Sequence, residues 1–156
     1  MENEVNVKRN LSEVYSKFKL NYYRSVFSTF ADREASLTTV ETYCVEVIHS
    51  LDNPTVNEFA SFLGISPPNA AYKVNKLVQK GYIEKIQSVE DKREYHLRVT
   101  DKFYHYYNLG LSYMDVVSER IMENLPEEEI RLLNKILRRI SDEFMPELPK
   151  INIDQK

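Results

Sequence analysis

The stretch that decides the fold runs from Leu63 to Thr100 and reads LGISPPNAAYKVNKLVQKGYIEKIQSVEDKREYHLRVT. Its first half predicts a helix that has Ser66 as capping residue and Pro67 at its first position. Gly81 follows the last turn, where glycine is favoured because it tolerates a left-handed backbone. The stretch therefore contains one helix whose two ends are both marked by the sequence.

Two short strands are predicted after this helix, because the apolar period changes beyond Gly81. They cover Tyr82–Val89 and Tyr95–Val99, and the polar turn Glu90–Arg93 lies between them. Upstream, Thr55 caps a shorter helix with Glu58 at the capping-box position, and Gly64 ends it. Two helices joined by a three-residue turn and followed by a hairpin are typical of a winged helix-turn-helix.

The second helix of this motif has two distinct faces. Its inward face carries apolar side chains at helical spacing: Ala70, Val74, Leu77 and Val78. Its outward face carries an amide, a phenol and cations: Asn69, Tyr72, Lys73, Lys76 and Lys80. Ser66 and Pro67 add short side chains at the N-terminal end. Short and amide side chains can reach base edges, and cations can meet phosphates, so this face is predicted to bind DNA.

Local charge favours the same interpretation. Residues 66–98 contain seven basic and four acidic residues, a balance of +3, whereas the whole chain carries −3. The hairpin turn contributes Lys92 and Arg93. A localised basic patch on an acidic protein is typical of a nucleic-acid footprint. Two alternatives remain open at this point, namely a merely solvated lysine face and a winged helix that binds proteins instead of DNA.

Long helices are predicted at both ends of the 156-residue chain. The first carries apolar residues every three or four positions from Val7 to Val26. After Thr100, a helix over residues 101–124 is followed by another that begins at Pro126. The latter has an a/d seam, made by Ile130, Leu133, Leu137, Ile140 and Phe144. The predicted fold class is therefore mainly α with a small β-hairpin wing (α+β).

Several classes of function are excluded by composition. Only three glycines occur, so the glycine-rich loops of many nucleotide enzymes are absent, and no catalytic constellation is found. We expect no enzyme activity and no cofactor. The histidines are scattered, and the Asp101–His105 pair alone does not predict a metal site. Cys44 is the single cysteine and is interpreted as a buried structural thiol. No signal or membrane-spanning segment is found, so a cytoplasmic protein without a membrane partner is expected.

The stretch resembles the DNA-binding segment of the MarR family of transcriptional regulators. The matching pieces are Leu77-x-x-Lys80-Gly81-Tyr82-Ile83, the wing Asp91-x-Arg93 and the exit Leu97-x-x-Thr100. The resemblance covers essentially the whole chain, since one long helix precedes the motif and two follow it. It implies a single unit over 1–156, with the winged lobe at 36–100 and a helical dimerisation region at 5–35 and 101–147.

The resemblance also implies a homodimer on a pseudo-palindromic operator in double-stranded DNA, most simply acting as a repressor. The wing would enter the minor groove, and we expect Asp91 to hold the Arg93 guanidinium extended. Effector pockets of the family lie between the winged lobe and the dimerisation helices. A small amphipathic or aromatic effector is expected there, against a tyrosine cluster made by Tyr22, Tyr23, Tyr43, Tyr104 and Tyr107. Rings that simply fill the core are the competing interpretation.

Overall fold

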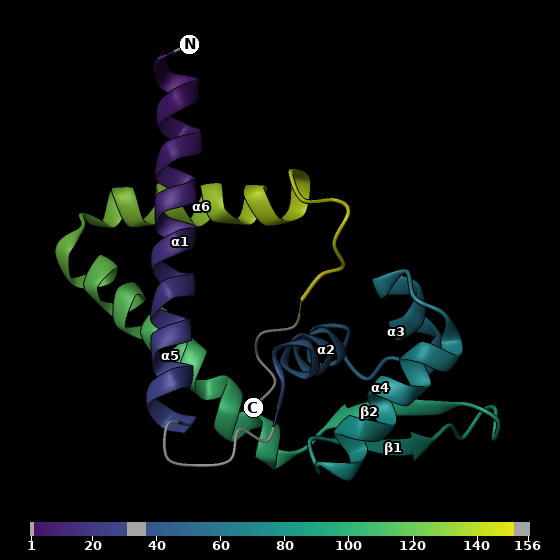
Figure 1. Ribbon diagram of the computed structural model, residues 1–156. Coiled ribbons are helices and arrows are strands. Elements are labelled where there is room, and N and C mark those ends of the chain that lie inside the picture. Colours follow the sequence, from purple (N-terminus) through teal and green to yellow (C-terminus); the bar gives the residue numbers. More distant parts are fainter. Residues whose placement is uncertain (1, 31–36, 152–156) are drawn as a thin grey trace. The chain divides into compact units, whose positions relative to one another are not determined.

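The computed structural model describes residues 2–30 and 37–151, and the side chains of residues 6–25, 37–105 and 112–151. The described chain is mostly helical and contains one two-stranded antiparallel sheet (Figure 1). It divides into two compact units, the first over residues 1–34 and 106–136 and the second over 35–105 and 137–156. The predicted fold class, a mainly helical winged helix-turn-helix, is confirmed.

The second unit begins with α2 (Thr39–Ser50) and α3 (Val56–Leu63). Both helices start in a full capping box, since Thr38 and Thr55 accept N–H bonds from Glu41 and Glu58, whose carboxylates accept in return. The Thr55–Glu58 box confirms the sequence prediction. Reciprocal bonds of this kind satisfy backbone donors that a helix start leaves open, and they fix where the chain enters each helix.

Next in the second unit comes α4 (Pro67–Gln79), which follows α3 after a short turn. Gly64 ends α3 with φ of 64°, and Gly81 follows α4 with φ of 77°. Both are left-handed conformations that glycine adopts at little cost. These two glycines therefore set the helix-turn-helix and the exit from α4 into the hairpin.

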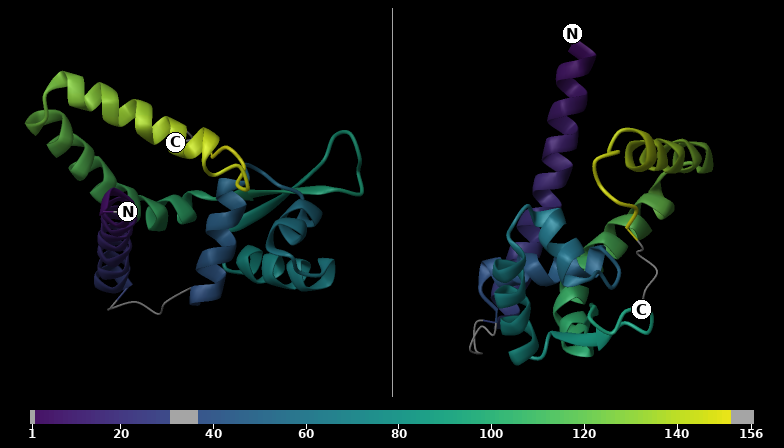
Figure 2. Two further views of the ribbon diagram at one scale, coloured as in Figure 1. Left: turned by 90° about the horizontal axis from the view of Figure 1, so that it is seen from above. Right: turned by 90° about the vertical axis from the view of Figure 1, so that its right-hand side faces the viewer.

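The hairpin consists of β1 (Ile83–Gln87) and β2 (Tyr95–Val99), paired with Ile83 opposite Val99 and Gln87 opposite Tyr95. β1 is shorter than predicted: Val89 lies in the turn and is 96% exposed. The tip projects beyond α3 and α4, as two views at right angles show (Figures 1 and 2). In its middle β2 also contacts the loop before α3, where the Leu97 N–H donates to the Pro54 carbonyl at 2.8 Å.

The core of the second unit lies where α2, α3, α4, the hairpin and the start of α5 (Asp101–Asn124) meet. Its fully buried side chains are Val45, Ile48, Phe59, Val74, Leu77, Ile83, Leu97 and Phe103. The inward face predicted for α4 is thus confirmed, because Ala70, Val74 and Leu77 are all 0% exposed. Burying one side of α4 in this core leaves its other side turned outward.

The first unit contains α1 (Glu2–Phe30), most of α5 and the first part of α6 (Glu127–Glu143). Phe18 of α1 packs edge-on against Tyr113 of α5, with ring centroids 5.7 Å apart. α6 begins directly after Pro126 with three glutamates in its first turn, where negative charge suits the helix dipole. None of the described helices is long and apolar enough to cross a membrane.

Candidate nucleic-acid interface

The N-terminal end of α4 is open to solvent. Ser66 is its capping residue by position, but the Ser66 hydroxyl makes no capping bond, and Pro67 takes the first turn without an N–H. Ser66, Pro67 and Asn69 are all exposed. The first turn thus offers a hydroxyl and an amide that are not used by the fold.

The outward face of α4 continues with three larger side chains, one turn apart or less. Tyr72 is 60% exposed, Lys73 is half-buried and Lys76 is exposed. The Lys76 ammonium lies 4.6 Å from the centroid of the Tyr72 ring. The neighbouring Tyr72 side chain raises the pKa of Lys76 above its ordinary value, at which a lysine is already charged at neutral pH. Tyr72 and Lys76 form a paired aromatic and cationic surface in the middle of the face.

Lys80 differs from the sequence prediction, which placed it on this outward face. Its ammonium donates to the Glu41 carboxylate of α2 at 2.7 Å, and Glu41 is almost fully buried. Burial alone would raise the pKa of Glu41, but the hydrogen bonds from Lys80 and Thr38 outweigh it, so the pKa of Glu41 is lowered. Lys80 therefore ties α4 to α2, and its charge is neutralised inside the fold.

Two hairpin cations are also bound within the unit. Lys85 donates to the Asn75 side chain of α4 at 2.7 Å. Arg98 forms a cross-strand ion pair with Glu84 at 2.7 Å. Of the seven basic residues between positions 66 and 98, Lys80, Lys85 and Arg98 are thus bound within the unit. The other four, which could contact another molecule, lie on α4 and at the hairpin tip.

The hairpin tip, residues 88–94, is ordered by its own hydrogen bonds. The Asp91 carboxylate accepts the backbone N–H of Arg93 at 2.9 Å, and the Asp91 carbonyl accepts from Glu94 N–H at 2.9 Å. The Ser88 hydroxyl accepts from Glu90 and Asp91. Ser88 is not among the residues predicted from the sequence, although a serine ahead of an acidic turn is a known local signal. These bonds end β1 before Val89.

Asp91 acts differently from the sequence expectation. It holds the Arg93 backbone, and within the described residues it makes no ion pair with the Arg93 guanidinium. Lys92 and Arg93 are exposed at the tip, and the Gln87 amide donates to the Lys92 carbonyl at 2.7 Å. The carboxylate therefore fixes the direction of the chain, and the two cationic side chains extend from it.

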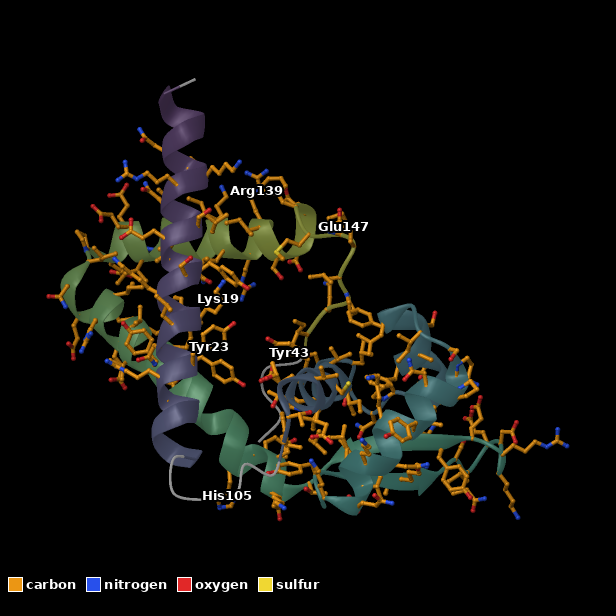
Figure 3. The ribbon with its side chains drawn as sticks, in the orientation of Figure 1. Lys19, Tyr23, Tyr43, His105, Arg139 and Glu147 are labelled. Carbon is orange, nitrogen blue, oxygen red and sulfur yellow. The ribbon has the colours of Figure 1, made fainter. Side chains whose placement is uncertain are left out.

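The predicted tyrosine cluster is distributed over both units. Tyr22 and Tyr23 belong to the first unit, where their rings lie 6.0 Å apart, whereas Tyr43 and Tyr104 belong to the second. Figure 3 labels Tyr23 on α1 and Tyr43 on α2. In the second unit Tyr43 lines an apolar cavity, and Tyr104 lines a separate polar one. The side chain of Tyr107 lies outside those that the structure describes.

Neither Cys44 nor His105 belongs to a reactive or metal-binding arrangement among the described residues. Cys44 is buried, and this burial raises the pKa of its thiol, so the protonated form prevails at neutral pH. A His105 ring nitrogen lies 3.0 Å from the backbone carbonyl of Asp101 rather than facing its carboxylate. Among the side chains that the structure describes, those of residues 6–25, 37–105 and 112–151, no three or more His, Cys, Asp or Glu are grouped to hold a metal.

Comparison with known proteins agrees with this geometry. Residues 37–95 match the sequence model of the MarR family. No curated protein sequence matches the chain significantly. The resemblance recognised in the motif residues is thus confirmed over the region that contains α2, α3, α4, β1 and the turn after β1, whereas the exit motif at Leu97–Thr100 lies beyond the match.

Solved structures extend the likeness beyond this region. Streptococcus pneumoniae FabT in complex with DNA is 24% identical, with a TM-score of 0.60 over 92% of this chain and 99% of that chain. A MarR family protein from Bacillus stearothermophilus gives a TM-score of 0.65 at 12% identity, over 92% and 96%. The transcriptional regulator Tm0710 from Thermotoga maritima gives 0.61 at 20%, over 86% and 91%. At these identities the likeness establishes the fold, including the long flanking helices.

Proposed function

We propose that this chain, whose residues 37–95 match the MarR family, is a DNA-binding transcriptional regulator without enzymatic activity. The observation that carries the proposal is the outward face of α4. Asn69, Tyr72, Lys73 and Lys76 lie on one face, opposite the buried side that anchors the helix. A helix held in this way can present its polar face to the major groove.

The wing gives a second contact of different character. Its tip places the Lys92 and Arg93 side chains outside the fold, on a turn fixed by Asp91 and Ser88. An arginine in the minor groove responds to the strong negative potential of narrow A·T-rich segments. The α4 face would thus read bases, and the wing would read the shape of the flanking groove.

The finer features of the proposal concern assembly and control. The chain acts as a homodimer through residues 5–35 and 101–147, and the two α4 helices contact half-sites about 34 Å apart on a pseudo-palindromic operator. It represses transcription from the occupied promoter, and a small effector releases it. The structure of FabT in complex with DNA supports the DNA contact by analogy, and that of Staphylococcus aureus MepR bound to ethidium bromide supports a small effector.

Two substitutions on α4 test DNA binding. Lys76→Ala should weaken binding to every DNA sequence and reduce the slope of log affinity against log salt by about one. Asn69→Ala should relax sequence preference instead, at about 1–3 kcal/mol for the favoured site. The measurement is selection of bound sequences from random DNA, followed by titrations at several salt concentrations.

Lys150→Ala is the matched control, because Lys150 is a lysine of the second unit whose side chain is 91% exposed and lies far from α4 in sequence. It should bind DNA like the unchanged protein. If Lys76→Ala, Asn69→Ala and Lys150→Ala all had the same DNA affinity and the same salt dependence, the DNA interface would not include α4. Failure of the unchanged protein to bind any DNA would favour a protein-binding winged helix.

A further inference from the structure

A polar cavity of about 510 Å³ opens to the surface of the second unit, and its lining includes neither the α4 face nor the wing tip. Three elements form its walls: the end of α2 with the loop after it, the hairpin, and the first turn of α5. The side chains that give it its chemistry are His49, Asp52, Glu84, Arg98, Asp101 and Tyr104. A cavity of this volume is within the range that holds small organic ligands.

The charge of the walls is negative overall. Glu84 and Arg98 neutralise each other in the ion pair at 2.7 Å. Asp52 and Asp101 add two carboxylates, and the Asp101 carboxylate makes no ion pair among the described residues. Burial lowers the pKa of His49, so its ring adds no positive charge at neutral pH. A cationic ligand would therefore meet attraction here, and an anionic ligand would meet repulsion.

Aromatic rings form one side of the same cavity. The His49 ring lies 5.1 Å from the buried Phe103 ring and 5.6 Å from the Tyr104 ring, edge-on to the latter. The rings of Phe103 and Tyr104 also contact each other, with centroids 5.7 Å apart. The Tyr104 side chain remains partly exposed to solvent. The face of a tyrosine ring attracts ammonium groups, and its body packs against apolar carbon. No metal-binding cluster is formed by the described residues, which favours an organic cation over a metal ion.

We propose that this cavity binds a small organic amine, with its ammonium group toward Asp101 and Asp52 and its apolar part against Tyr104. The site gives the effector of the proposed regulator a chemical class. The effect of the amine on DNA binding rests on the proposed function, whereas binding of the amine to the cavity does not. β2 forms part of the wall, so an occupant contacts the strand that follows the turn carrying Arg93.

Calorimetric titration of the full chain with two aromatic probes of similar size and opposite charge tests the proposal. Phenethylamine should bind at least about tenfold more tightly than phenylacetate, because the wall carries excess carboxylates. Asp101→Asn should weaken phenethylamine binding by about tenfold while keeping the size and helix-start role of the residue. Asp115→Asn, an exposed aspartate of the same helix outside the cavity, should leave the affinity unchanged.

Three results would overturn the amine site: equal binding of both probes, unchanged affinity in Asp101→Asn, or no binding of phenethylamine at millimolar concentration. Retention of the same protein on random-sequence DNA is measured in parallel. Amine binding without DNA binding would refute the proposed function and support the cavity site. DNA binding without amine binding would support the proposed function and refute the cavity site.

Discussion

Asp91 shows how a single carboxylate shapes the part of the protein that we expect to enter the minor groove. Its side chain accepts the Arg93 N–H at 2.9 Å, a bond that an asparagine oxygen can also accept. Asp91→Asn should therefore keep the turn and bind DNA at least as tightly as the unchanged protein. Asp91→Ala should loosen the turn and weaken binding.

Arg93→Ala is the companion variant for this first prediction. It should lower DNA affinity about tenfold, or about 1.4 kcal/mol, with little change in melting temperature because Arg93 is exposed. Gel-shift titration and thermal unfolding provide the two readouts. If Asp91→Asn were as damaging as Asp91→Ala, the carboxylate charge and not the backbone bond would be the important feature.

Glu41 and Lys80 form an ion pair, and its removal should measurably lower the free energy of unfolding. In Glu41→Gln the amide can still serve the capping box, but the ion pair between buried Glu41 and partly exposed Lys80 is gone, at a cost of about 1–2 kcal/mol in the free energy of unfolding. Because the pKa of Glu41 is lowered in the folded state, its contribution is present above the unfolded pKa of about 4.5. It is lost as the pH falls through the folded pKa.

The difference in unfolding free energy between Glu41→Gln and the unchanged protein should thus be largest near pH 7 and shrink below about pH 4. Urea titrations at pH 7, 5 and 3.5 measure it. Glu13→Gln is the control, since the Glu13–Lys17 pair has the same 2.7 Å separation but is exposed on α1. It should change stability little at any pH. A pH-independent difference for Glu41→Gln would contradict the assignment.

The roles of Lys80 and Asp91 could not be predicted from the sequence at residue scale. Helical spacing placed Lys80 on the same face as Lys73 and Lys76, but its long side chain bends toward a carboxylate 39 positions earlier in the chain. Periodicity assigns a direction to the Cβ and not to a flexible ammonium group. Similarly, a two-residue spacing permits both a side-chain and a backbone partner for Asp91, and only the turn geometry decides between them.

At the scale of elements, the turn between α3 and α4 depends on Gly64. Its φ is 64°, yet a Cβ built there would meet no atom within 4 Å. Gly64→Ala should therefore cost only the conformational penalty of a left-handed alanine, about 1 kcal/mol in unfolding free energy. Gly64→Asn should cost less, because asparagine tolerates this conformation. Urea unfolding gives the values, and equal stability of all three proteins would show that the turn relaxes.

Local sequence signals predicted the helices and strands of the second unit well. Contacts between residues far apart in the sequence were not predicted. The Thr55–Glu58 capping box, the two glycines and Pro67 mark helix ends through interactions within four residues, which a sequence displays directly. The contact of Pro54 with Leu97 joins residues 43 positions apart, and the isolated bridge between Thr55 and His96 accompanies it. No period or motif encodes such a partner, so the loop before α3 was not recognised as an edge of the hairpin.

At the scale of the whole molecule, the helices outside the winged lobe leave much apolar surface uncovered. No side chain of α6 is buried, and Leu132, Ile136 and Leu137 are about half exposed. On α1, Val7 and Leu11 are 67% and 57% exposed. Contiguous apolar faces of this kind are unusual on a monomer and are typical of surfaces covered by a partner. Of the seam that the sequence predicted, Leu137 and Phe144 are exposed, whereas Ile130, Leu133 and Ile140 are partly covered.

The last prediction follows from this exposure. At micromolar concentration the chain should sediment as a species of twice its 18.4 kDa mass. Leu11→Asp and Leu137→Asp should each shift it toward the monomer, because a carboxylate buried without a partner opposes association. Val89→Asp introduces the same charge at an apolar residue of the wing tip that is 96% exposed, and it should leave the dimer intact. A stable monomer of the unchanged chain, or equal behaviour of all three variants, would contradict dimerisation through these helices. In that case two copies of α4 could not be held at a fixed spacing, and a pseudo-palindromic operator would lose its physical basis.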